Sequence, residues 1–109
     1  MEDRRIFSRI SVSFQLKFLD LNSGKAGEAE TVDISANGVG FVTKEILSER
    51  TPLEMWLIIP DHHEPFYTQG EVVWSQALNG DDLQRVGVQL RKEDFIGVAR
   101  ALWIKNQNQ

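Results

Sequence analysis

The sequence predicts an all-β protein with one terminal helix, namely a six-stranded antiparallel β-barrel followed by a C-terminal α-helix. Apolar and polar residues alternate along most of the chain, which is the pattern of half-buried strands. Short stretches rich in Asn, Ser, Gly and Pro separate the alternating segments, as turns do. A closed sheet fits these strands, because closure removes exposed edges and encloses the apolar side chains.

The first strand is predicted over residues 10–18, where apolar and polar side chains alternate. The segment LNSGKAG at residues 21–27 has the composition of a turn. Later strands are predicted over residues 53–59, 66–75 and 85–90, and the segments PDHHEP and ALNGDDL separate them. We expect the six strands to follow one another in meandering order.

The second strand begins near Ala29 and places the side chains of Thr31, Asp33 and Ser35 on one face. Asn37-Gly38 predicts a two-residue turn, because both residues tolerate positive φ. The third strand, over residues 39–43, therefore returns along the second.

The period of the apolar residues changes at the end of the chain. There they recur at intervals of three and four, so one terminal helix is expected to cap the sheet. These helical positions are Phe95, Ile96, Ala99, Leu102 and Trp103. The tryptophans lie in apolar alternation or on the apolar helix face and are assigned to the core: Trp56, Trp74 and Trp103.

Length and composition allow one domain, since 109 residues with 41% hydrophobic content can form a single modest core. Residues 1–9 are predicted to be a flexible N-terminal ligand-binding arm, and residues 10–105 a single barrel domain with its helix. The sequence has no apolar run of about twenty residues, so no membrane insertion is expected and the cytoplasm is the expected location. Because cysteine is absent, neither disulfides nor thiolate zinc sites can form.

Two groups of polar residues predict a binding site. Arg4, Arg5 and Arg9 gather in a polar arm of a chain whose net charge is -4, which suits either a local anion site or a solvated tail. Asp33 and Ser35 are expected to be exposed on the same face of one strand, pointing away from the core, where they could bind a ligand or hydrogen-bond the backbone of the next turn. A carboxylate and a hydroxyl can read the donor edge of guanine, while arginine can hold guanine or phosphate. Together the groups favour a ligand that contains both guanine and phosphate.

The spacing Arg5-x-x-x-Arg9 followed by Asp33-x-Ser35-x-x-Gly38 resembles the paired signature of PilZ domains, receptors for the bacterial second messenger cyclic di-GMP. The segments GEVVW at residues 70–74 and VGVQL at residues 86–90 are similar to core strands of that family. The resemblance covers the whole chain and implies a PilZ-type barrel.

The resemblance also implies roles for individual residues. The arginines of the first motif would clamp phosphates and a guanine, and the carboxylate and hydroxyl of the second would hydrogen-bond a guanine edge. The glycine would let the turn pass close to the ligand. An arginine at the place of Arg4 tends to accompany two intercalated ligands per chain rather than one. The ligand-binding residues are therefore expected to be Arg4, Arg5, Arg9, Asp33, Ser35, Asn37 and Gly38.

Other chemistries have little support in the sequence. Asp61 to Glu64 offers four adjacent metal-ligand types, but adjacent side chains diverge and no distant partner has ligand spacing, so no metal is expected. No nucleophile motif is present, so no catalytic residue is predicted. An acidic chain also argues against DNA or RNA as a partner.

The sequence thus favours a noncatalytic receptor with no cofactor, whose arm folds across the barrel when cyclic di-GMP binds. The signal would pass to an unidentified downstream protein of a motility, pilus or exopolysaccharide machinery. The alternative is an adaptor of the same fold, in a pilus, flagellar or polysaccharide-export system, with weak or no ligand binding.

Overall fold

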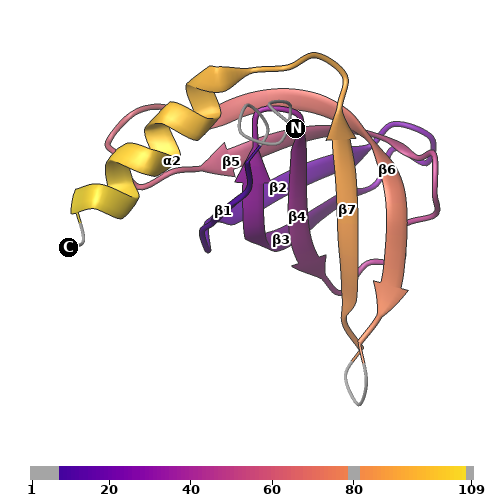
Figure 1. Cartoon of the computed structure of the whole chain (residues 1–109). Coiled ribbons are helices and arrows are strands. Elements are labelled where there is room, and N and C mark those ends of the chain that lie inside the picture. Colours follow the sequence, from indigo (N-terminus) through magenta and orange to yellow (C-terminus); the bar gives the residue numbers. More distant parts are fainter. Residues whose placement is uncertain (1–7, 79–81, 108–109) are drawn as a thin grey trace.

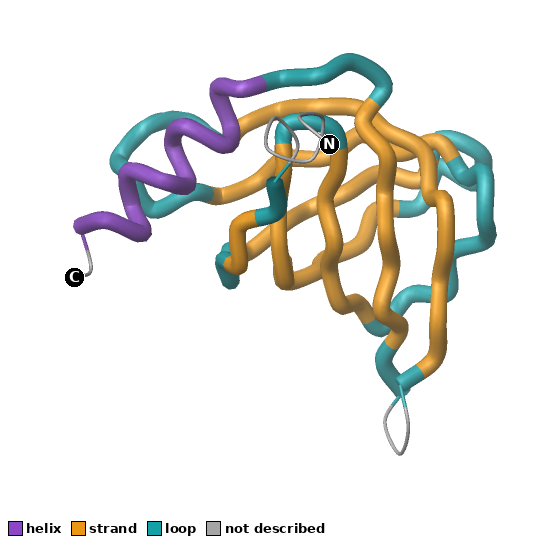
Figure 2. Tube along the Cα trace, viewed as in Figure 1, coloured by secondary structure: helices purple, strands orange, loops and turns teal. Residues whose placement is uncertain are grey.

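The computed structural model describes residues 8–78 and 82–107, which form an antiparallel barrel and one helix (Figures 1 and 2). The elements are β1 (Ile10–Ser11), β2 (Gln15–Asp20), β3 (Ala26–Ser35), β4 (Gly38–Thr43), β5 (Pro52–Ile58), β6 (Phe66–Ala77), β7 (Gln84–Leu90) and α2 (Phe95–Gln107).

Six strands close the barrel in the order β3-β2-β5-β6-β7-β4, and the pairing of β3 with β4 completes it. All pairings are antiparallel, and β1 adds to the free part of β3. The predicted fold class is confirmed. The order is not a simple meander, because the chain crosses between β4 and β5 so that β5 pairs with β2 and β7 pairs with β4.

The predicted strand over residues 10–18 is divided into β1 and β2. Both parts pair with β3, but their registers differ by one residue, since Ser11 pairs with Asp33 and Gln15 with Glu30. The extra residue interrupts the ladder at residues 12–14. Thr31 replaces the lost ladder bonds, because its side-chain oxygen accepts a hydrogen bond from the backbone N–H of Phe14 and its hydroxyl donates to the carbonyl of Val12, both at 2.7 Å.

Strand β3 contains a bulge that changes which residues face outward. Its register against β4 shifts between Thr31, which pairs with Phe41, and Asp33, which pairs with Gly40. Val32 is the additional residue, so Thr31 points into the barrel and is buried while Asp33 points outward. The prediction that Thr31 shares a face with Asp33 and Ser35 is therefore wrong.

The turn between β3 and β4 lies one residue earlier than predicted. Ser35 pairs with Gly38, so Ala36 and Asn37 are the two connecting residues. Among the residues that the structure describes, positive φ occurs at Gly24, Arg50 and His62, and not at this turn. The hairpin itself is confirmed, but its turn does not depend on positive φ at Asn37 or Gly38.

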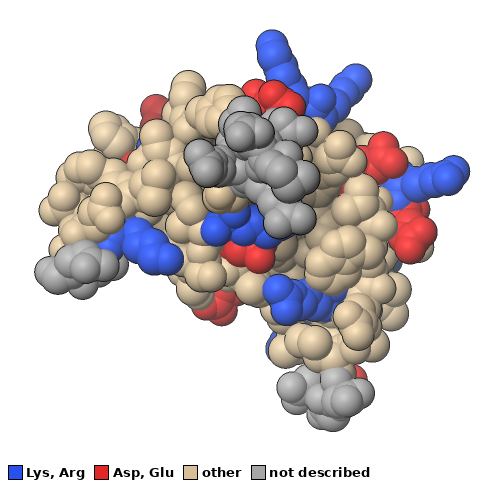
Figure 3. Space-filling model, viewed as in Figure 1, with Lys and Arg blue, Asp and Glu red and all other residues tan. Residues whose placement is uncertain are grey.

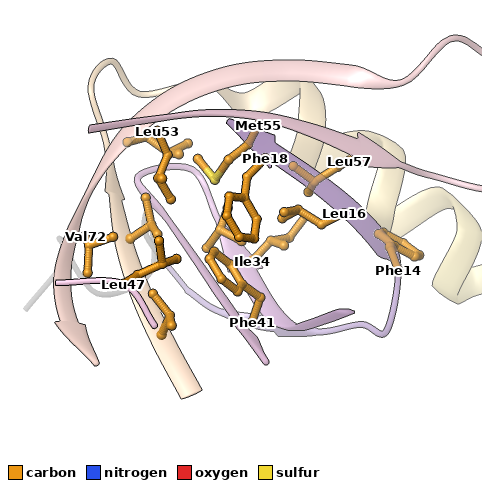
Figure 4. Close-up of a cluster of buried hydrophobic side chains, with 14 of the residues drawn as sticks. Phe14, Leu16, Phe18, Ile34, Phe41, Leu47, Leu53, Met55, Leu57 and Val72 are labelled. Atoms are coloured by element: carbon orange, nitrogen blue, oxygen red, sulfur yellow. The ribbon is translucent and has the colours of Figure 1, made fainter. Parts of the chain in front are cut away.

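The barrel interior is filled by aliphatic and aromatic side chains from every long strand (Figure 4). The rings of Phe18 and Phe41 stack near its centre, with centroids 5.8 Å apart. The assignment of the tryptophans to this core is wrong. Trp56 faces outward from β5 and contacts Tyr67, and Trp74 and Trp103 are 40% and 53% exposed.

Helix α2 lies across one end of the barrel, beside β1 (Figure 1). Ala101 belongs to the core cluster, and Gly97 lies so close to Phe66 that a Cβ atom there would be 2.9 Å from the ring. Arg100 ties the helix to the loop between β5 and β6 through two 2.6 Å bonds to Asp61. Within the described residues, no helix has the length and apolar character needed to cross a membrane.

Candidate functional site

Arg9 and Asp33 form an ion pair on the outer face of the barrel, with 2.8 Å between Arg9 Nη1 and Asp33 Oδ1. The pair brings together residues from the two predicted motifs, which are 24 positions apart. The side chains are 50% and 19% exposed. An ion pair this accessible contributes only about 0–1 kcal/mol to the stability of the fold. Stabilisation of the fold therefore does not by itself account for the pair.

The direction of Asp33 follows from the bulge at Val32 and from the glycine opposite. The bulge turns the carboxylate outward over β4, where Gly40 is its cross-strand neighbour. A Cβ atom at Gly40 would lie 2.7 Å from Asp33 Oδ1. Only glycine therefore leaves room for the carboxylate in this position.

Ser35 and Asn37 hold the adjoining turn together. The Ser35 hydroxyl donates a 2.9 Å hydrogen bond to Asn37 Oδ1, and Ser35 is 3% exposed. The prediction that Ser35 is an exposed hydroxyl is thus wrong. A longer hydrogen bond, 3.4 Å from the Ser35 hydroxyl to the carbonyl oxygen of Gly38, matches the alternative that the sequence left open, in which the motif bonds the backbone of its own turn.

Gly38 lies directly beside the ion pair. A Cβ atom there would be 3.2 Å from Arg9 Nη2 and 3.1 Å from the carbonyl oxygen of Val88. The absence of a side chain at Gly38 therefore lets the guanidinium approach the strand. Four residues predicted for the site, Arg9, Asp33, Ser35 and Gly38, thus lie together.

A row of cross-strand pairs that includes two glycines extends from Asp33 across the barrel. Asp33 pairs with Gly40, Gly40 with Gly87, and Gly87 with Trp74, which places these residues in one row over four strands. A Cβ atom at Gly87 would collide with the Trp74 indole, so the ring lies over that glycine. The row therefore has a carboxylate at one end and a partly exposed aromatic ring at the other.

The sequence did not predict Trp74 as part of this surface. Its register against β7 shifts between Val72 and Trp74, so a second bulge at Val73 turns the indole outward. Simple alternation within GEVVW gives no sign of that bulge. The paired Gly87 was the available signal, since a strand glycine often marks a bulge or a close approach.

The turn of the second motif is also bonded to the start of the helix. Its two connecting residues, Ala36 and Asn37, accept backbone hydrogen bonds at 2.9 Å from Asp94 and at 2.8 Å from Leu90. Asp94 directly precedes α2, and its side chain caps the N–H of Ile96. The candidate site and the helix therefore share backbone contacts.

Arg4 and Arg5 lie outside the described residues, so the structure places only Arg9 of the predicted arginine group. The family comparison extends to that segment, because the model of the PilZ domain matches residues 3–100. The chain belongs to the PilZ domain family. No curated protein matches the sequence.

Solved structures similar to this PilZ domain share its fold at low sequence identity. MotI (DgrA), an inhibitor of motility from Bacillus subtilis, is 16% identical with a TM-score of 0.70, covering 95% of this chain and 51% of that one. MrkH of K. pneumonia is 19% identical with a TM-score of 0.68, covering 94% and 47%. The PilZ domain of Escherichia coli YcgR, solved with c-di-GMP, is 13% identical with a TM-score of 0.62, covering 89% and 83%. The chain thus spans about half the length of MotI and MrkH.

Asp61 of this PilZ domain forms an ion pair with Arg100, with 2.6 Å between Asp61 Oδ2 and Arg100 Nε. The paired guanidinium and a hydrogen bond from the backbone of His63 hold the pKa of the Asp61 carboxyl well below its usual range, against the opposing effect of burial. The same pairing raises the pKa of Arg100. Within residues 8–78 and 82–107, no three His, Asp or Glu side chains gather as a metal site.

Proposed function

We propose that this PilZ domain is a noncatalytic receptor for cyclic di-GMP and that it relays binding to a downstream protein. The observation that carries the proposal is the Arg9–Asp33 pair, which joins both motifs on an accessible face of the barrel. The YcgR PilZ domain solved with c-di-GMP supports the choice of ligand. We place the receptor in the cytoplasm, where a bacterial second messenger is available.

The two charged residues would bind complementary parts of the ligand. The Asp33 carboxylate can accept hydrogen bonds from the N–H groups on the edge of guanine, while Arg9 can donate to a phosphate or to guanine O6 and N7. Asp33 uses one oxygen and Arg9 one terminal nitrogen in their mutual bond, which leaves further acceptor and donor capacity. Their pairing would hold both groups in place before the ligand arrives, which lowers the entropy cost of binding.

The remaining residues would shape the surface around that pair. Gly38 would let the turn pass close to the ligand, and Gly40 would leave room for the Asp33 carboxylate. Ser35 would act through Asn37 by keeping the turn in position. Trp74 offers a ring face on which a second base could stack, an interaction worth about 1–3 kcal/mol. Arg4 and Arg5 would add phosphate contacts from the arm.

The relay would use two connections. The arm before Arg9 would be drawn across the outer face by the ligand phosphates and create a new surface. Displacement of the turn at Ala36 and Asn37 would also move Leu90 and Asp94, because those residues donate backbone hydrogen bonds to the turn. A partner in a motility, pilus or exopolysaccharide machinery would recognise the changed surface.

Calorimetric titration with cyclic di-GMP, GTP and a single-stranded oligonucleotide tests the proposal. We expect saturable binding of cyclic di-GMP alone. Lys17→Ala is the matched control for a lost cation, since Lys17 is an exposed residue of β2. A folded wild-type protein that gives no heat with cyclic di-GMP would refute the receptor role and leave the adaptor alternative.

A further inference from the structure

Helix α2 presents its large apolar side chains to solvent. It packs on the barrel through small or medium residues, namely Gly97, Ala101 and Ile104. The larger ones point away and are 43–64% exposed: Phe95, Ile96, Leu102 and Trp103. A helix that covers a core normally has the opposite arrangement, so this outer stripe is suited to contact with another surface.

Charged groups of the helix are drawn away from the stripe. Arg100 donates hydrogen bonds to Asp61 and to the carbonyl of Glu64, and Lys105 Nζ lies 3.4 Å from the carbonyl oxygen of Ser11. Both basic side chains thus bond to the barrel. Figure 3 shows few charged atoms over α2 on the face in view.

The stripe is symmetric about Ala99. Ile96 and Leu102 lie three residues before and after it, and Phe95 and Trp103 lie four residues before and after it. Ala99 is itself exposed. Residues three and four apart share a helix face, so the stripe reads large, small, large from either end. Such a surface is complementary to an antiparallel copy of itself, as a two-fold interface requires.

We propose that the chain forms a two-fold dimer in which the α2 helices of two copies pack antiparallel, with Ala99 facing Ala99 at the crossing. Phe95 and Ile96 of one copy then lie beside Leu102 and Trp103 of the other. The small residue at the centre permits an interaxial distance of about 8 Å. A contact with a different protein would not require the stripe to be symmetric, whereas a two-fold contact between identical helices does. We therefore take a second copy of the chain as the partner that covers the stripe. The proposal does not depend on cyclic di-GMP.

The dimer is expected to be weak. The exposed parts of the four large side chains offer roughly 400 Å² per copy, so the interface would fall below the roughly 1,200 Å² typical of stable complexes. Association should therefore depend on concentration, with a Kd in the range of about 10 μM to 1 mM.

Cysteine cross-linking tests the arrangement, because the natural sequence has no cysteine. Ala99→Cys should form a disulfide-linked dimer under mild oxidation, since the two positions face each other within the usual Cα separation of about 4.4–6.8 Å. Phe95→Cys alone should not, because antiparallel packing separates its two copies along the helix. Glu71→Cys, at an exposed position on β6, is the matched control.

Sedimentation equilibrium between about 10 μM and 1 mM provides the second measurement. The wild-type average mass should rise toward twice the monomer, while Ala99→Glu, whose site is exposed, should stay folded and raise the Kd at least tenfold. Wild-type protein that remains monomeric throughout would overturn the proposal. Equal cross-linking of Ala99→Cys and Glu71→Cys, or efficient cross-linking of Phe95→Cys alone, would also overturn it.

Discussion

The Asp33 carboxylate occupies the space that a side chain on Gly40 would fill, because a Cβ atom there would lie 2.7 Å from Asp33 Oδ1. Gly40 lies outside both arginine and aspartate motifs, yet it decides where the carboxylate can sit. Gly40→Ala should displace the carboxylate, since a flexible side-chain end moves more easily than a strand. We expect at least a tenfold loss of cyclic di-GMP affinity by calorimetry, with a melting temperature near that of the wild type. Unchanged affinity would show that the position of Asp33 does not matter for binding.

Arg9→Ala and Asp33→Ala should each weaken cyclic di-GMP binding at least tenfold. Each change leaves a ligand group without a charged hydrogen-bond partner, which costs roughly 1.5–3 kcal/mol. The fold should be retained, because the exposed pair contributes only about 0–1 kcal/mol. Titration of both variants and of Lys17→Ala, with circular dichroism as the folding control, checks this. Wild-type affinity in either folded variant would remove that residue from the site.

Trp74 should report ligand binding through its fluorescence. We expect cyclic di-GMP to change the emission of the wild type and of Trp56→Phe, but not that of Trp74→Phe, because the Trp56 ring instead packs against Tyr67 on β5 and β6. Trp74→Ala should also reduce affinity about 5- to 150-fold through lost stacking. The same emission change in Trp74→Phe would place the ligand elsewhere.

Asp61→Asn should lower the melting temperature by several degrees at pH 7. The melting temperature of the variant should also fall less on acidification than that of the wild type. The pKa of Asp61 is lower in the folded protein than in the unfolded chain, where it is about 3.9. The ionised Asp61 carboxylate therefore makes its full contribution to the free energy of unfolding above that pH. This contribution is lost as the pH falls below about 4. The difference between wild type and variant should therefore be constant from pH 7 to 5 and shrink below 4. Glu71→Gln, which makes the same carboxylate-to-amide change at an exposed position of β6, is the control. A difference that grows on acidification would contradict the assignment.

Arg4→Leu should shift the binding ratio from two cyclic di-GMP molecules per chain toward one. A second ligand brings two more phosphate charges and another guanine, and an additional guanidinium can neutralise the charges and stack on the base. Saturating titration at a known active-protein concentration measures the ratio. A wild-type ratio of one, or a ratio of two that persists in the variant, would rule out this role. A loss of affinity and salt dependence at constant ratio would instead indicate nonspecific attraction.

The barrel was predictable because alternation is regular wherever strands are regular. In β5, Leu53, Met55 and Leu57 point inward as alternation predicts, whereas Trp56, which was assigned to the core for its residue type, points outward. Alternation fails at Val32 and Val73, where bulges add a residue to one strand only. A bulge depends on the register with a neighbouring strand, which the local pattern does not contain.

The spacing of the two motifs predicted which residues of the candidate site lie together, but not which of them are exposed. Arg9, Asp33 and Gly38 lie together as expected, but the exposure of Ser35 and Trp74 was predicted wrongly. Ser35 is buried and hydrogen-bonded within its own turn, and Trp74 is turned outward by the bulge. The exposure of an individual side chain depends on tertiary packing. Residue type and spacing predict exposure only as an average over many residues.

The hydrogen bond from Asp94 to Ala36 bears on how short a working fragment of this chain can be made. The family match ends at residue 100, in the middle of α2, whereas the barrel strands end at Leu90. A fragment trimmed to Leu90 would leave the Ala36 carbonyl in the site turn without its partner. Trimming after residue 100 would remove Ala101, which is fully buried in the core. A fragment that keeps the motif turn intact must therefore include helix α2. It must extend beyond Leu90, where the strands end, and beyond residue 100, where the family match ends.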